Sequence, residues 1–249
     1  MILTQKARAI FDAALCLTYP QRCLLCGASV ELRALGVACA ECWSFVKLFS
    51  STDSVCWKCC RPTVVNSLEL NDFQIMCHEC DEQYFTAARA CGVYEGALRQ
   101  NVLELKKRPY LPAKLSELLV NAAKQSPLST STRIVPIPLH PFREKKRGFN
   151  QAAVMARSLA KAIKLPVDEV STVRVRHSEK YRAGLDFKAR SETVAEAFEV
   201  IQRRLISNES ILLLDDVFTT GATASNCAKA LINAGAKSVF VLTLARPGH

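Results

Sequence analysis

Two adjacent carboxylates and a group of hydroxyl side chains lie close together toward the end of the sequence. Asp215 and Asp216 follow the apolar run 211–214, and three threonines surround a glycine just after them. An apolar run of this length is typical of a buried parallel strand, and residues 222–234 repeat apolar side chains at helical spacing. The segment is therefore predicted to be a strand, a loop and a helix.

The predicted loop carries groups that bind phosphate. Backbone N–H groups and the positive end of a helix dipole favour an anion there, and a glycine lets the backbone approach it. Carboxylates at the end of the strand can accept hydrogen bonds from a ribose diol. An ordinary strand-to-helix turn is the alternative, but it needs neither two acids nor three hydroxyls. The predicted ligand is a ribose 5-phosphate, bound by Asp215, Asp216, Thr219, Thr220, Gly221, Ala222 and Thr223.

The segment from Ile211 to Thr223 resembles the motif of type I phosphoribosyltransferases that binds phosphoribosyl pyrophosphate (PRPP). The resemblance implies an α/β, Rossmann-like domain with a mainly parallel sheet, and it implies that PRPP binds together with Mg2+. In a catalytic protein, Asp215 and Asp216 would hold the ribose hydroxyls and stabilise an oxocarbenium-like sugar.

A strongly basic segment follows a second strand pattern at residues 133–139. Residues 140–147 are predicted to form a basic loop before a helix at 149–163. In type I phosphoribosyltransferases the loop after the first core strand carries the pyrophosphate, so the resemblance gives this role to Arg143 and Arg147, with Lys145 and Lys146 adding charge. A solvated basic loop is the alternative.

Four Cys-x-x-Cys pairs precede these elements. Each pair forms a tight turn whose two thiolates can bind one tetrahedral zinc ion, and two pairs complete a closed structural site. Pairing of neighbouring pairs closes the shorter loops, although a cross-braced arrangement remains open. One or two structural Zn2+ ions are predicted, bound by Cys23, Cys26, Cys39 and Cys42 and by Cys56, Cys59, Cys77 and Cys80.

Length, charge and cysteine content limit the class of protein. The 249 residues allow one substantial core and a smaller second unit. Residues 1–84 are predicted to hold an N-terminal helix and the zinc-binding module, and residues 85–249 the phosphoribosyltransferase-like domain. The net charge of +10 favours anionic partners such as nucleic acid. Because no secretory signal or membrane span is recognisable, the 12 cysteines indicate metal binding in the cytoplasm rather than disulfides.

Two helical patterns leave their roles open. Residues 2–17 form an amphipathic pattern that favours packing on the core, with a partner surface as the alternative. The helix predicted from Tyr94 to Leu105 ends in Lys106, Lys107 and Arg108. These cations could be a solvated helix end or could face an anion, and their spacing does not distinguish the two.

The whole chain resembles the ComF/GntX family of competence proteins. The resemblance rests on the cysteine pairs, on residues 135–140, on Arg147-Gly148-Phe149-Asn150-Gln151 and on the PRPP motif. It implies a role in DNA uptake and single-stranded DNA handling during natural transformation, with DNA-processing proteins as expected partners.

Residues 174–198 correspond to the flexible loop of this family. The family pattern places Gln and Asn where this sequence has Arg182 and Thr193, whereas Leu185 and Arg190 match it. Arg182 and Arg190 are predicted to contact phosphate or a nucleic-acid backbone.

Three functions are compatible with these features. The first is a competence protein that binds PRPP. The second is a non-enzymatic module that binds single-stranded DNA, with Phe149, Tyr181 and Phe187 as stacking platforms. The third is an active phosphoribosyltransferase that transfers ribose 5-phosphate to an unidentified acceptor, as in nucleotide salvage.

Overall fold

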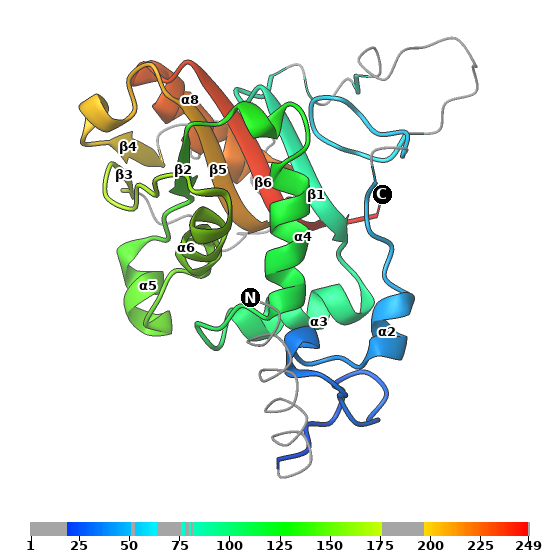
Figure 1. Ribbon diagram of the computed structural model, residues 1–249. Helices are drawn as coiled ribbons and strands as arrows, with labels where there is room; N and C mark the ends of the chain where they lie inside the picture. Colours follow the sequence, from blue (N-terminus) through cyan, green and yellow to red (C-terminus); the bar gives the residue numbers. More distant parts are fainter. Residues whose placement is uncertain are drawn as a thin grey trace, which may run out of the picture.

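The computed structural model describes residues 19–50, 53–63, 76–77, 80, 82–175 and 197–248 (Figure 1). The predicted helix at residues 2–17 lies outside the described residues. The same holds for Arg182 and Arg190, and for the proposed stacking residues Tyr181 and Phe187.

A four-stranded sheet forms the centre of the molecule. All of its neighbouring strands are parallel, as predicted, so the α/β class is confirmed. In spatial order the strands are β1 (Ala87–Val93), β6 (Ser238–Arg246), β5 (Ser210–Val217) and β2 (Arg133–Pro136). Strand β1 was not predicted, because its alanine-rich sequence contains few β-branched or aromatic residues.

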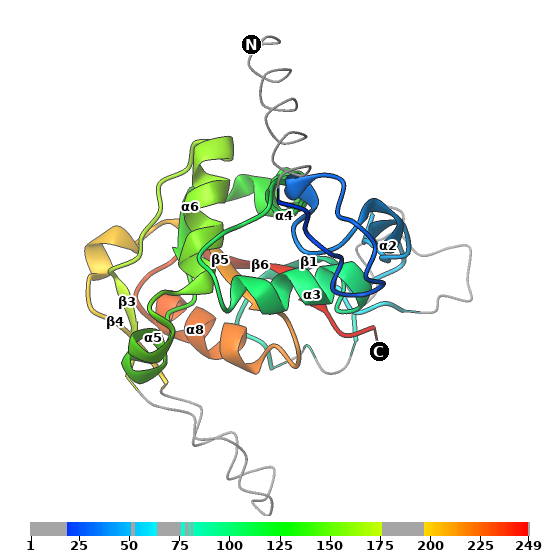
Figure 2. The same ribbon diagram turned by 90° about the horizontal axis from the view of Figure 1, so that it is seen from below.

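Helices cover both faces of this sheet. Leu212 and Leu214 point to one face and Ile211 and Leu213 to the other, and all four are fully buried. Each such side chain contributes about 1.5–3 kcal/mol to folding. Figure 2 shows α4 and α6 on one side of the sheet and α8 on the other. The helices are α3 (Gly96–Leu105), α4 (Ala113–Ala123), α6 (Gln151–Ile163) and α8 (Ala222–Asn233).

The basic segment after β2 is a helix, so the predicted loop at residues 140–147 is wrong. Helix α5 (Pro141–Arg147) begins with a proline in its first turn, and the His140 side chain accepts a hydrogen bond from Phe142 N. Three basic side chains in its last turn complement the helix dipole. Gly148 ends the helix with φ +84°.

Shorter elements complete the described part of the chain. Strand β3 (Thr172–Arg174) pairs antiparallel with β4 (Phe198–Val200) outside the main sheet. The remaining helices are α2 (Ala40–Ser44) and the 3-10 turns Arg33–Leu35, Leu128–Thr130 and Arg203–Leu205. None of the described helices has the length and apolar character needed to span a bilayer.

The cysteine-rich region packs along the free edge of β1. Phe49 N donates a hydrogen bond to Cys91 O at 2.9 Å, and Ala88 N donates to Lys58 O at 2.6 Å. These contacts satisfy backbone groups that an edge strand would otherwise expose. The predicted domain boundary between residues 84 and 85 therefore separates segments that are hydrogen-bonded to each other.

Candidate functional site

The loop between β5 and α8 has the predicted strand-loop-helix geometry. Thr219 and Thr220 are exposed, and α8 starts one residue after Gly221. Gly221 adopts φ +80°, and a Cβ added there would lie 2.6 Å from Cζ of Phe218. The backbone conformation and the neighbouring ring thus both require glycine at this position.

Four of the predicted ligand residues line one small hollow at the carboxyl end of β5. Asp215, Thr219, Gly221 and Thr223 line it together. The adjacent N-terminus of α8 supplies the positive end of its dipole. A phosphate in the loop and a diol near the acids would therefore be neighbours.

Asp216 is the centre of a buried polar network. Its Oδ2 lies 2.5 Å from Lys106 Nζ, and its Oδ1 accepts a hydrogen bond from Gln151 Nε2 at 3.1 Å. Arg147 Nη1 donates to Oε1 of the same glutamine. The ends of α3, α5 and β5 and the start of α6 are thereby connected through side chains.

The two carboxylates differ in protonation. Burial and the charge of Asp216 raise the pKa of Asp215 well above its ordinary value. Burial opposes ionisation of Asp216, but Lys106, Asp215 and Gln151 together lower its pKa. Asp216 is therefore the charged member of the pair, while Asp215 retains a proton more readily.

Arg174, at the end of β3, was not among the predicted site residues. Burial and the charge of Arg143 lower the pKa of Arg174, whereas the charge of Asp215 raises it. These interactions place Arg143, Arg174 and Asp215 in one electrostatic environment. The guanidinium of Arg174 also lies over the Phe198 ring, 5.3 Å from its centroid.

The alternatives left open for the end of α3 are resolved. Lys106 faces the carboxylate of Asp216, whereas Lys107 and Arg108 pair with Glu104 on their own helix. Only a contact between distant segments distinguishes these three cations, so local sequence could not separate them.

The eight cysteines of the four pairs form two clusters, in the predicted sequential pairing. The first cluster contains Cys23, Cys26, Cys39 and Cys42, and the second contains Cys56, Cys59, Cys77 and Cys80. Within each cluster the Sγ atoms lie within 4.8 Å of one another. Sulfur atoms around a tetrahedral zinc ion would be about 3.8 Å apart, given Zn–S bonds of about 2.3 Å.

Sulfur distances close to this value occur in both clusters, although Cys77 and Cys80 are only 3.1 Å apart. Cys23 and Cys42 are 3.7 Å apart, and Cys56 and Cys80 are 3.6 Å apart. Burial opposes ionisation of Cys23, but backbone hydrogen bonds lower its pKa to about 6. Burial also opposes ionisation of Cys56, and backbone hydrogen bonds lower its pKa to about 7. A thiolate in each cluster is thus stabilised by the backbone, as a metal ligand requires.

The second cluster borders the loop of the candidate site. Arg246 is buried, and its Nη1 donates a hydrogen bond to Cys59 O at 2.5 Å. Its guanidinium lies 5.5 Å from the ring centroid of Phe218, which precedes Thr219. Cys59, Cys80, Thr219 and Thr220 also line one small hollow together with Arg246.

Comparison with known proteins identifies relatives that are named as competence or DNA utilization proteins. No family model matches the chain. The chain is 33% identical over 136 residues to competence protein F of Haemophilus influenzae. The matched residues cover 54% of this chain and 59% of that protein. It is 27% identical to competence protein ComFC of Bacillus subtilis, covering 90% of this chain and 94% of that protein. The predicted resemblance to the ComF/GntX family is confirmed.

The DNA utilization protein YhgH of Salmonella typhimurium is a further relative, 29% identical over 92% of this chain and 99% of that protein. Among solved structures, a glutamine PRPP amidotransferase from B. subtilis overlaps 57% of this chain and 30% of its own, with 17% identity and a TM-score of 0.38. A hypoxanthine phosphoribosyltransferase from Staphylococcus aureus overlaps 59% and 64% of the two chains, with 16% identity and a TM-score of 0.32.

Proposed function

We propose that this chain is a competence or DNA-utilization protein whose C-terminal part binds PRPP with Mg2+. The observation that carries the proposal is the placement of Asp215 and Asp216 at the end of β5, one short loop before α8. Competence protein relatives support the cellular role.

Each part of PRPP has a counterpart among the described residues. Thr219–Thr223 and the start of α8 would bind the 5-phosphate, and the two aspartates would accept hydrogen bonds from the ribose hydroxyls. Arg143, Arg147 and Arg174 would provide charge for the pyrophosphate. Arg182 and Arg190 stay predictions for the same group.

The proposed Mg2+ would reach the site with its ligand. Mg2+ commonly binds proteins through one or two carboxylates together with substrate phosphates. The ionised Asp216 beside the half-buried Asp215 supplies hard oxygen ligands of the kind that Mg2+ prefers. The ion would neutralise charge on the pyrophosphate oxygens.

Titration calorimetry with PRPP and Mg2+ tests this site. The wild-type chain should bind with saturation, and Asp215→Asn combined with Asp216→Asn should abolish binding while conserving side-chain shape. Glu117→Gln is the control, because Glu117 pairs with Lys114 on the surface of α4. Equal affinity in the double aspartate variant would reject the site.

Single-stranded DNA is a second proposed ligand, favoured by the +10 charge and by α5. Lys145 and Lys146 in the last turn of this helix are exposed. Neutralising phosphates by such residues makes affinity fall steeply with salt. Lys145→Ala with Lys146→Ala should lower DNA affinity and flatten its dependence on salt concentration. An unchanged dependence on salt would exclude α5 from the DNA-binding surface.

Catalytic transfer of the phosphoribosyl group is the alternative use of the same site. Release of pyrophosphate from PRPP, measured with and without bases and DNA as acceptors, separates binding from turnover. Release that depends on one acceptor and is lost in Asp215→Asn would establish an enzyme.

The two cysteine clusters are proposed to hold structural Zn2+. Four thiolates per ion leave no position open for water or substrate, so the metal would stabilise the fold. The second cluster would in addition support the loop at Phe218.

A further inference from the structure

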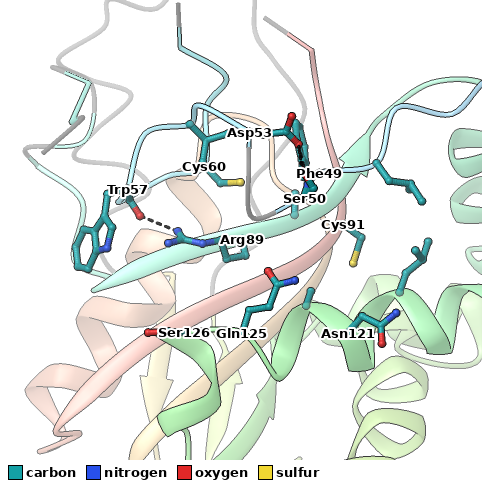
Figure 3. Close-up of a pocket in the computed structure, with 15 residues that line it drawn as sticks. Phe49, Ser50, Asp53, Trp57, Cys60, Arg89, Cys91, Asn121, Gln125 and Ser126 are labelled. Atoms are coloured by element: carbon teal, nitrogen blue, oxygen red, sulfur yellow. Dashed lines mark hydrogen bonds between the residues drawn. The ribbon is translucent and has the colours of Figure 1, made fainter. Parts of the chain in front are cut away.

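A cavity of about 680 Å3 lies beside β1, and none of the predicted PRPP-binding residues lines it (Figure 3). Its walls are residues of the ranges 48–50 and 53–60, the strand residues 89–91 and the end of α4 with the turn that follows. This volume falls within the range of small-molecule binding sites.

Two hydrogen-bonded contacts on β1 border the cavity. The cysteine-rich segment is hydrogen-bonded to the strand at Phe49 and again at Lys58, which lies between two cysteines of the second cluster. The second cluster thus fixes one wall, and α4 fixes another.

Aromatic and apolar side chains line part of the cavity. Figure 3 shows Trp57 at one end and Phe49 toward the other, with β1 between them and α4. Leu118 and Ala122 contribute an apolar surface from α4. Flat aromatic walls of this kind favour a planar ligand, because they offer stacking area at little entropic cost.

Arg89 directs donors to the same space. Its Nη1 donates to Trp57 O at 2.7 Å and to Ala88 O at 2.8 Å, which fixes the guanidinium. Both bonds use one nitrogen, and Nη2 and Nε make no hydrogen bond with the part of the chain that the structure describes. They can therefore donate to a carbonyl or ring nitrogen of a ligand.

The other polar groups make the cavity close to neutral. Asp53 balances the charge of Arg89, and its Oδ2 accepts hydrogen bonds from the N and Oγ of Ser50. Gln125 lies two residues after the end of α4 and is exposed, so its carboxamide is available. A carboxamide offers both a donor and an acceptor to the edge of a base, whereas a phosphate would need net positive charge.

We propose that this cavity binds a nucleobase, stacked against Trp57 and hydrogen-bonded by Gln125 and Arg89. The base could belong to a free nucleoside or to single-stranded DNA, and the chemistry that recognises it is the same. The site is separate from the proposed PRPP site.

Tryptophan fluorescence of the zinc-loaded full chain tests this proposal, because Trp43 is buried and Trp57 lines the cavity. The probes are free deoxynucleosides, a short single-stranded oligonucleotide and an abasic oligonucleotide of equal length, at a salt concentration that suppresses phosphate contacts. Gln125→Ala removes the edge contact, and Ala122→Phe fills the space. Gln202→Ala is the matched control, because Gln202 is an exposed amide elsewhere.

Saturable quenching by a base-containing probe is expected, with affinity lowered roughly ten-fold or more in both cavity variants. Gln202→Ala and Asp215→Asn with Asp216→Asn should leave it unchanged, so failure of the PRPP site and of this site are distinguishable. Binding of free nucleosides would identify soluble nucleosides as the source, and binding of the oligonucleotide alone would identify the strand. Equal affinity in the cavity variants, equal binding of the abasic probe, or no saturable binding would overturn the proposal.

Discussion

Lys106 Nζ lies 2.5 Å from Asp216 Oδ2, so the basic end of α3 neutralises a buried carboxylate at the end of β5. The contact joins segments that are far apart in the sequence. It also leaves Asp216 ionised in the site proposed to bind ribose.

Lys106→Met should lower the free energy of unfolding by about 1–3 kcal/mol at pH 7, because it leaves a buried charge with fewer partners. The pKa of Asp216 is lowered in the folded protein, so its stabilising effect is present above the ordinary Asp pKa near 3.9 and is lost as the pH falls through the lowered value. Urea unfolding at pH 7 and pH 3 measures both effects. Lys107→Met, which affects an exposed pair on α3, should change little.

Asp215→Asn should stabilise the ligand-free protein while abolishing PRPP binding. Burial and the neighbouring Asp216 raise the pKa of Asp215, so its ionisation costs stability. This cost is absent below the ordinary Asp pKa and grows as the pH rises toward the raised value. The urea midpoint of the variant should therefore exceed that of the wild type at pH 7 and match it near pH 3. A lower midpoint at pH 7 would contradict the assignment of charge within the pair.

Gly221→Ala should cost about 2–4 kcal/mol of stability and weaken PRPP binding. Its positive φ disfavours any side chain, and the added Cβ would collide with the ring of Phe218. Gly27→Ala is a matched control, because Gly27 has φ +76° but no heavy atom within 4 Å of the added Cβ. It should cost only about 1 kcal/mol. Thermal unfolding compares the two, and equal losses would show that the Phe218 contact has no effect.

Metal analysis should find two zinc ions per chain, one for each cysteine cluster. Cys26→Ser with Cys39→Ser should remove one of them, since two ligands of the first cluster are lost. Cys227→Ala should retain both, because this buried cysteine lies in α8 outside the clusters. One ion in the wild type would show that a cluster is held without metal.

Arg246→Met should increase amide hydrogen exchange in the loop from Phe218 to Gly221. The variant loses the hydrogen bond to Cys59 O and the contact with the Phe218 ring, which fix the loop against the second cluster. Arg157→Met provides the comparison, because Arg157 forms an exposed ion pair with Glu169. Unchanged exchange in the loop would show that the cluster does not support it.

Local patterns were sufficient for the elements whose signals are contiguous. The segment from β5 to α8 carries its apolar run, acids and glycine in order, and the cysteine pairs fall into clusters between sequence neighbours. Strand β1 was missed because short side chains and Arg89 weaken its β pattern, and α5 was missed because its cations resemble a solvated loop.

The contacts of the site were harder to predict than its elements. Lys106 and Arg174 approach the acids only through tertiary packing, and spacing along the chain carries no signal for such contacts. The Arg246 hydrogen bond to Cys59 joins strand β6 to the cysteine-rich region in the same way.

The position of β6 between β1 and β5 has a consequence for synthesis on the ribosome. Strands β1, β2 and β5 all emerge before β6, yet β1 has no partner in the sheet until β6 is made. The cysteine-rich region also emerges early, and the hydrogen bond between Cys59 O and Arg246 cannot form until β6 is made. A ribosome that stalls before residue 238 would therefore release a chain with exposed thiols and an incomplete sheet, which quality-control proteases can recognise.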